Sequence, residues 1–337
     1  FESSYFDPAE PTITAVAAVF RAGKPLYPAL DAPERYAHIY GPVLFIVQAG
    51  AFAIAGASIF VSKAVGSVAA LASLAIVYIV YQRRAGAVAA LLVTAVIALV
   101  DLYFNNVTFW TRSDPLLILC TAIGLAGAHV QRSLPASIVL GMAAGAAINL
   151  KITGAIYLVP VFAIALSRHR AGVLWAATGI AFVAASTPFL LPHVSLSNYL
   201  GYLQLSARNG LLPAKLLENA EWALVLLAPL AVACRGMGTA RLEPDARRFL
   251  TCLVVAVGTI GFAAAKPGGG SFHFLPFLPL LGYAALTVPR GAWNEIAATR
   301  VAVAFAIMAF AIALPRQAIF VRTVADRHLE QAIADLD

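Results

Sequence analysis

The feature that most constrains this chain is the recurrence, from one end to the other, of apolar runs of roughly 15–20 residues separated by short basic segments. Hydrophobic residues make up 61% of the sequence, whereas soluble globular domains contain roughly 45–50%. A soluble fold would need polar faces on these runs, and they have almost none. The sequence therefore predicts an all-α protein whose helices cross a membrane several times.

The formal net charge of +7 does not change this interpretation. The basic residues lie mostly at the ends of the apolar runs, where the positive-inside rule and anionic phospholipid account for them. We therefore expect membrane lipid, and no nucleic acid, as a partner. Cys120, Cys234 and Cys252 lie in or beside apolar runs without metal-ligand spacing, which is typical of small hydrophobic core residues.

Arginine-rich segments such as Arg83-Arg84 predict the orientation, because loops rich in Arg and Lys remain in the cytoplasm. The segments between them, Asp101–Asp114, Lys151, His193–Glu221, Lys266–His273 and the tail after Pro315, then lie outside. We expect a first extracytoplasmic loop with juxtamembrane helices over 1–65, a transmembrane bundle over 66–316 and a polar tail over 317–337. The alternation predicts about ten spans, at 67–82, 87–103, 115–130, 135–149, 152–166, 172–190, 222–234, 249–265, 274–289 and 299–314.

The apolar run Val43–Val61 breaks this alternation, because its crossing would force Arg83-Arg84 to the outside. We predict that it is a juxtamembrane or shallowly buried helix on the outer side that does not cross. An amphipathic helix over Thr12–Ala22 precedes it and could lie on the membrane surface. Because Phe1–Pro42 has no anchor ahead of it, we expect a transmembrane helix before Phe1.

Acidic residues are concentrated where chemistry could take place. Charged residues make up 12% of the chain, yet Phe1–Pro42 alone contains Asp7 and Glu10 among its acids. These two either start a solvated helix or serve a site. Asp114 begins an apolar helix in the next outer loop, which also contains Arg112 and more polar groups than a plain connector needs. We expect Phe1–Pro42 and Asp114 to form two walls of one extracytoplasmic site.

Two lysines are candidate anion-binding residues. Lys151 interrupts two short apolar runs and is expected in a water-filled recess, because a lysine facing lipid is costly. Lys266 opens a glycine-rich segment ending at His273, where backbone N–H groups could approach a phosphate. Alternatively, Lys266 extends to the interface and the glycines form a flexible turn. His38 and Tyr40 belong to the interfacial aromatic belt or to a ligand site.

Several reaction classes are disfavoured. The sequence contains no HExxH, CxxC or GxSxG pattern, so a metalloprotease, a redox dithiol and a serine hydrolase are not expected. We predict no metal-ligand set from side chains, and the residues leave open whether a divalent cation assists. The DxD motif, Asp335-Leu336-Asp337, ends the polar tail and is interpreted as solvated charge.

A series of short segments occurs in one order along nearly the whole chain: Glu10-Pro11, Gly23-x-Pro25-Leu26-Tyr27, Tyr40-Gly41-Pro42, Arg112-Ser113-Asp114-Pro115-Leu116, Lys151 and His273-Phe274-Leu275-Pro276. In order and spacing they resemble the bacterial GT-C membrane glycosyltransferases, in particular the relatives of protein O-mannosyltransferases and of lipid A aminoarabinose transferase. The resemblance implies a polyprenyl-phosphate-linked sugar donor, a site at the outer face of the bacterial inner membrane, and inverting transfer to a lipid or glycan acceptor.

The resemblance also implies roles for individual residues. Glu10 matches the second position of the family's Asp-Glu pair, and Ala9 stands where the Asp would be, so the base is either Glu10 or Asp7. Asp114 matches the acid of the second outer loop. Lys151 and Lys266 resemble the cations that hold the lipid phosphate. The remaining candidate substrate-binding residues are Arg112, His273, His38 and Tyr40.

The main alternative is a secondary transporter or lipid flippase. Such a protein would show inverted repeats and charges near the middle of the membrane. The sequence shows neither, because its charges lie in loops and only Lys151 is a candidate for depth. A purely structural membrane component would leave the acidic first loop without a role.

Overall fold

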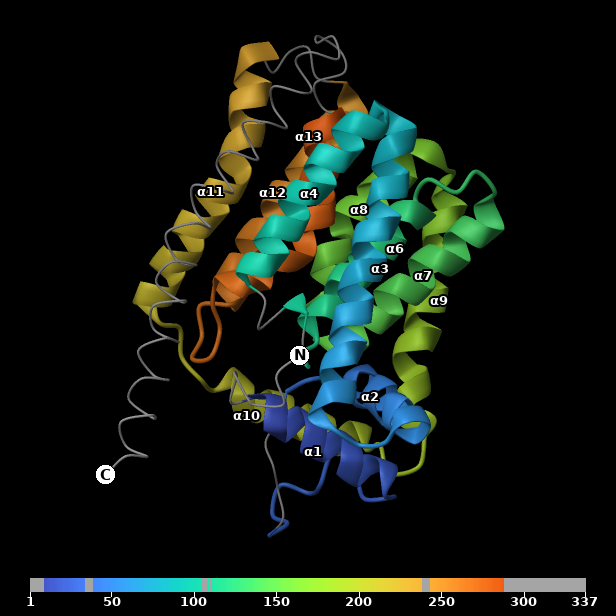
Figure 1. The fold of residues 1–337 in the computed structure, drawn as a ribbon, viewed down its shortest axis with the longest axis vertical. Coiled ribbons are helices and arrows are strands. Elements are labelled where there is room, and N and C mark those ends of the chain that lie inside the picture. The colour runs from blue at the N-terminus through green and yellow to red at the C-terminus, as the bar shows by residue number, and fades with distance from the viewer. Residues whose placement is uncertain (1–8, 34–38, 105–107, 110, 238–242, 288–337) are drawn as a thin grey trace, which may run out of the picture.

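The computed structural model describes residues 9–33, 39–104, 108–109, 111–237 and 243–287. Within these ranges the chain consists of helices and loops without strands, which confirms the predicted all-α class. Neighbouring helices pack lengthwise into a bundle (Figure 1). The bundle contains α3 (Ile59–Ala85), α4 (Ala87–Tyr103), α6 (Asp114–Gly127), α7 (Ser133–Leu150), α8 (Gly154–Arg168), α9 (Ala171–Ser186), α11 (Pro213–Met237), α12 (Pro244–Ala263) and α13 (Leu278–Thr287).

Three further helices lie at one end of this bundle, which we call the capped end (Figure 1). They are α1 (Ala9–Arg21), α2 (Pro42–Ala55) and α10 (Leu196–Ala207). Backbone contacts join the first loop to the segment before α10: the Leu26 N–H donates to the His193 carbonyl at 2.9 Å. The Asn198 side chain likewise donates to the Tyr27 carbonyl at 2.9 Å. Segments that are far apart in the sequence therefore form one structure at the capped end.

The chain is a multi-pass membrane protein. Among the described residues, 4 helices are long and apolar enough to cross a bilayer: α3, α7, α12, and α9 together with the 3-10 helix η1 (Thr187–Leu190). The other apolar helices are shorter, at 10–17 residues. The positions of the predicted spans agree with bundle helices except for 299–314, which lies outside the described residues, as does the tail 317–337.

The structure corrects the prediction for the run after the first loop. The run Val43–Val61 is not one helix, because α2 ends at Ala55 and α3 begins at Ile59. Gly56 adopts a φ of 83°, which favours glycine, and the Ser58 hydroxyl accepts a hydrogen bond from the Val61 N–H at 3.2 Å. A 14-residue helix such as α2 is about 21 Å long, shorter than a ~30 Å hydrocarbon core. Its position outside the membrane stays a prediction.

The segment 193–221, which the sequence predicts to lie outside, contains α10 and the first turns of α11. The Ser195 hydroxyl accepts a hydrogen bond from the Asn198 N–H at 3.2 Å and so caps α10. Pro213 is the first residue of α11, a position that tolerates the missing N–H. The predicted span 222–234 is therefore too short at its start.

Close packing between α7 and α9 depends on glycine. A methyl group added at Gly141 would lie 2.6 Å from Ile180 Cβ, and one at Gly145 would lie 2.5 Å from Ala184 Cβ. Small residues allow the helix backbones to approach in this way. The Asn149 side chain donates to the carbonyls of Ala184 and Ala185 at 3.2 and 3.0 Å. The end of α7 is thereby fixed where it meets the capped end.

Helix α1 packs its apolar face against the rest of the protein. Ile13, Val16 and Ala17 share that face and are buried, and α1 packs against α2 and α3. This packing places Glu10, in the first turn of α1, against the start of α3.

Candidate functional site

A buried ion pair lies at the centre of the candidate site. Asp114 is the first residue of α6, and Lys151 directly follows α7 with extended backbone angles. The Lys151 Nζ lies 2.6 Å from Asp114 Oδ1. The Asp114 side chain is fully buried and that of Lys151 is 11% exposed. The second carboxylate oxygen of Asp114, Oδ2, is buried and has no hydrogen-bond partner among the described residues, so it can accept a bond from a ligand.

Aromatic and basic side chains surround this pair. The Lys151 Nζ lies 3.5 Å from His273 Nδ1, 5.9 Å from the centre of the Tyr40 ring and 5.6 Å from that of Phe272. The Arg112 guanidinium lies 4.9 Å from the centre of the Phe272 ring. We call these residues the Lys151 cluster: Tyr40, Arg112, Asp114, Lys151, Phe272 and His273. The structure thus brings together five of the residues that the sequence singles out, and it adds Phe272.

Burial sets the charges in this cluster. It lowers the pKa of Lys151, and the neighbouring Asp114 carboxylate opposes that shift. Burial also lowers the pKa of His273 to about 3, and the positive charge of Lys151 acts in the same direction. The His273 ring is therefore neutral near pH 7. The Tyr157 hydroxyl donates to the His273 carbonyl at 2.9 Å and fixes the 3-10 helix η3 (Ser271–Phe277) in place.

The Tyr40-Gly41-Pro42 segment reaches the cluster because Gly41 has no side chain. The Gly41 N–H donates to the Leu150 carbonyl at 3.2 Å. A Cβ at Gly41 would overlap the Asn149 carbonyl. Glycine at this position thus allows the loop to pack directly on the end of α7. The neighbouring Tyr40 is placed beside Lys151 as a result, and its own carbonyl accepts a hydrogen bond from the Tyr27 hydroxyl at 2.9 Å.

Glu10 belongs to a second buried ion pair. Its Oε2 lies 3.6 Å from the Lys63 Nζ, and both side chains are at most 2% exposed. Its Oε1 accepts a hydrogen bond from the Thr111 hydroxyl at 3.4 Å. Thr111 lies three residues before Asp114, so the segment that carries Asp114 also contacts Glu10 through a hydrogen bond. Sequence reasoning missed Lys63, although a lysine between apolar and small residues of a helix was a signal.

Other candidates are not part of the Lys151 cluster. Asp7 and His38 lie outside the described residues. Lys266 follows α12, and its side chain makes no ion pair among the described residues. The glycine-rich segment was predicted either to offer its N–H groups to a phosphate or to form a turn. The Gly269 N–H donates to the Lys266 carbonyl at 2.9 Å, which closes a turn.

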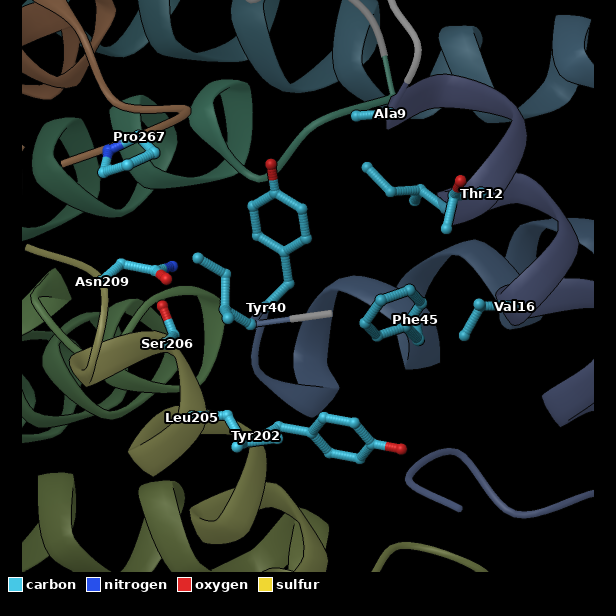
Figure 2. A pocket seen from close by; sticks show the side chains of 12 residues that line it. Ala9, Thr12, Val16, Tyr40, Phe45, Tyr202, Leu205, Ser206, Asn209 and Pro267 are labelled. Atoms are coloured by element: carbon cyan, nitrogen blue, oxygen red, sulfur yellow. The ribbon is translucent and has the colours of Figure 1, made fainter. Parts of the chain in front are cut away.

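A cavity of about 500 Å³ lies beside the Lys151 cluster at the capped end (Figure 2). Its wall includes Ala9, which precedes Glu10, and Tyr40, which contacts Lys151. Neither Glu10 nor Asp114 lines it directly. The remaining lining residues are Thr12, Ile13, Val16, Ile39, Phe45, Tyr202, Leu205, Ser206, Asn209 and Pro267.

No group of three or more His, Cys, Asp or Glu side chains that could hold a metal ion occurs within the described part of the chain. Cys120 is buried and Cys252 half-buried, both as free thiols.

Comparison with known proteins supports the interpretation of this geometry. A family model described as dolichyl-phosphate-mannose-protein mannosyltransferase matches residues 39–196. The crystal structure of ArnT from Cupriavidus metallidurans bound to undecaprenyl phosphate superimposes with a TM-score of 0.59 and 16% identity, over 92% of this chain and 68% of that one. The chain has the GT-C fold of membrane glycosyltransferases. The resemblance inferred from the short motifs is thereby confirmed.

A second GT-C structure, ArnT from the same organism in the apo state, has a TM-score of 0.60 and 15% identity over 83% of this chain. The match covers 55% of that ArnT chain. No curated protein sequence matches this chain significantly. At such identities the likeness shows the GT-C fold, and the roles of single residues are argued from their chemistry.

Proposed function

We propose that this GT-C protein transfers a sugar from a polyprenyl-phosphate-linked donor to an acceptor hydroxyl, with inversion, on the extracytoplasmic side of the bacterial inner membrane. The observation that carries this proposal is the buried Asp114–Lys151 pair. It lies within a ring of aromatic and basic side chains at the capped end of an apolar bundle. The predicted outer segments supply every member of that ring.

Lys151 and Arg112 are proposed to hold the donor phosphate. A GT-C structure of ArnT contains undecaprenyl phosphate, which supports a lipid phosphate as the ligand class. Cations near the departing phosphate stabilise the negative charge that develops on it. Asp114 orients Lys151 through Oδ1, and its buried Oδ2 is available to a sugar hydroxyl. Lys266, His273, His38 and Tyr40 are proposed to complete the substrate contacts.

The proposed reaction is a single displacement. The acceptor oxygen forms a bond to the anomeric carbon of the sugar, and the bond from that carbon to the phosphate oxygen breaks. Polyprenyl phosphate leaves with the electron pair, and the hydroxyl proton passes to a carboxylate of the first loop. Glu10 can accept it once the ion pair with Lys63 opens. Asp7, three residues earlier, is the other candidate. A positioned base contributes roughly 10²–10⁴-fold.

The test uses purified protein with polyprenyl-phosphoryl sugars and measures the release of polyprenyl phosphate. Asp114→Asn and the variant of the true base, Glu10→Gln or Asp7→Asn, should each lower the rate by roughly 10²-fold or more. Asp31→Asn is the matched control, because Asp31 is an exposed acid of the same loop. Wild-type rates in all of these variants would refute the site. Movement of the donor between leaflets without release of polyprenyl phosphate would instead indicate the flippase alternative.

A further inference from the structure

One aromatic ring in the Lys151 cluster lies close to two positive charges. The Arg112 guanidinium lies 4.9 Å from the centre of the Phe272 ring, and the Lys151 Nζ lies 5.6 Å from the same centre. Both distances are within the ~6 Å over which the negative face of an aromatic ring attracts a cation. Phe272 therefore contacts both of the side chains that are proposed to hold the donor phosphate.

The two cations repel each other at these positions. Burial lowers the pKa of Lys151, the Asp114 carboxylate opposes that shift, and the positive charge of Arg112 adds to it. Asp114 is the only acid among the six residues of the cluster, and the His273 ring is neutral near pH 7. Arg112 and Lys151 also come from different segments of the chain. A group that attracts both of them is needed to keep them together.

An aromatic ring can do this without adding a charge. A second carboxylate between the two cations would attract them, but it would also repel an incoming phosphate. The ring attracts cations through its quadrupole and carries no net charge. The cluster therefore keeps two positive side chains against one negative one, which suits an anionic ligand.

The Phe272 ring has a fixed position. Phe272 is the second residue of η3, and the Tyr157 hydroxyl holds that helix through its hydrogen bond to the His273 carbonyl at 2.9 Å. The ring packs against the hydrophobic core of the bundle, and its centre lies 4.4 Å from that of the His273 ring. A ring held in this way can position the longer and more flexible side chains of Arg112 and Lys151.

We propose that Phe272 is a positioning residue whose ring holds Arg112 and Lys151 beside each other, so that both contact the same phosphate group. The inference rests on the proposed function and adds a residue to it. Phe272 acts through the two cations and takes no part in making or breaking bonds. Donor binding should therefore depend on the electron density of the ring as well as on its size.

The experiment varies that electron density while the ring stays nearly the same size. Phe272 is replaced by phenylalanines with one, two and three ring fluorines, which make the ring face progressively less negative. The dissociation constant for undecaprenyl phosphate is measured with the purified full chain in lipid nanodiscs. We expect it to rise with each fluorine, to roughly tenfold for three. A dissociation constant that does not follow the number of fluorines would overturn the inference.

Phe274 provides the matched control. It belongs to the same 3-10 helix and is buried, and within the described part of the chain no positive side chain lies over its ring. The same fluorinated residues at this position should leave the dissociation constant unchanged. Equal effects at Phe272 and Phe274 would mean that fluorine acts through packing, and the inference would be overturned.

A second measurement tests the contact without any ligand. The ¹⁹F NMR signal of 4-fluorophenylalanine in place of Phe272 should shift in Lys151→Met and in Arg112→Met, because each variant removes a charge beside the ring. The signal of the same residue in place of Phe274 should shift less. Equal shifts at the two positions would contradict a role of Phe272 in holding the cations.

The two proposals fail in different ways. If the wild-type protein neither binds undecaprenyl phosphate nor releases polyprenyl phosphate from a sugar donor, the proposed function fails, and the ¹⁹F shifts still decide whether the ring holds the cations. If the wild-type protein does both and fluorine at Phe272 has no effect on binding, only the role of Phe272 fails.

Discussion

Lys63 and Lys151 are two buried lysines at the capped end, and each is paired with an acid from another part of the chain. The two acids differ in how many of their carboxylate oxygens are bonded. Both oxygens of Glu10 are engaged, one by Lys63 and one by the Thr111 hydroxyl. Asp114 uses Oδ1 for Lys151, and its Oδ2 has no hydrogen-bond partner among the described residues. Asp114 Oδ2 is therefore available to accept a hydrogen bond from a ligand. Glu10 could accept a proton only after its ion pair with Lys63 opens.

Variants of the Glu10–Lys63 pair distinguish its contribution to stability from its contribution to activity. Lys63→Met leaves a buried carboxylate without its cation, and we expect the variant to lose about 3–5 kcal/mol of stability. Glu10→Gln/Lys63→Met removes both charges and should recover most of that loss. Thermal unfolding in detergent measures both, with the exposed Lys24→Met as control. A double variant no more stable than Lys63→Met would contradict the pairing. A stable but inactive double variant would support a chemical role for Glu10.

The lowered pKa of His273 predicts how activity depends on pH. With a pKa of about 3, the ring stays neutral from pH 5 to 8, so it adds no positive charge to the proposed phosphate site. By linkage, folded protein loses stability as the pH falls below about 6.5, because the unfolded chain binds the proton first. The rate of polyprenyl phosphate release should have the same pH profile in wild type and His273→Gln. If the wild-type rate changed with pH near 6.5 and this change were absent in His273→Gln, the prediction would be contradicted.

Asp114, Lys151 and His273 could be found from the sequence, because a lone ionisable residue beside an apolar run stands out. Lys63 carried a similar signal, but its partner could not be assigned from the sequence. It resembles a cation at a helix end, and only the packing of α1 on α3 shows that Glu10 faces it. The hydrogen bond between Thr111 and Glu10 likewise joins residues 101 positions apart. A contact between residues so far apart leaves no periodic pattern in the sequence from which it could be predicted.

At the scale of elements, the contact between the start of α2 and the end of α7 positions the site. Gly41 packs on the Asn149 carbonyl, and Asn149 in turn donates to the carbonyls at the end of α9. The Gly41 N–H also bonds the Leu150 carbonyl. Lys151 comes directly after these residues. The position of its ammonium group therefore depends on how closely the two helix ends approach.

Gly41→Ala should disturb this approach. The added Cβ would overlap the Asn149 carbonyl, so either the loop or the end of α7 must shift and move Tyr40 away from Lys151. We expect a loss of at least roughly tenfold in transfer rate and a lower unfolding temperature. Gly50→Ala is the matched control: it lies within α2 with nothing near its Cβ, and alanine is the better helix former. Equal activity of the two variants would show that the contact does not position the site.

Element boundaries were predicted unevenly, and the reasons are local. The span 87–103 agrees with α4, because Gly86 ends α3 with a φ of 84° and marks the start of the next helix. The helix α10 was not predicted, because it lies between the predicted spans 172–190 and 222–234. Its start signal, Ser195 capping the Asn198 N–H, is weak in sequence alone. The break at Gly56–Ser58 was hidden by the apolar residues on both sides.

At the scale of the whole molecule, two parts of the surface differ in composition. The bundle exposes large apolar side chains such as Trp175 at 77% and Phe182 at 73% on α9, as expected for a helix facing lipid. At the capped end, by contrast, charged and aromatic side chains from segments far apart in the sequence lie close together. The sequence predicted that the first loop and the segment that carries Asp114 would meet there. It could not predict their distances, because these depend on side-chain packing between helices.

Binding of the donor lipid should therefore stabilise the whole fold. A ligand that binds only the folded state adds about 2.7 kcal/mol at 100 times its dissociation constant, so undecaprenyl phosphate should raise the unfolding temperature in detergent. Lys151→Met should remove most of that increase, because it removes the proposed phosphate contact. Lys24→Ala should keep it, since Lys24 is an exposed lysine of the first loop. An equal increase in both variants would mean that the lipid tail, rather than the phosphate at Lys151, accounts for binding.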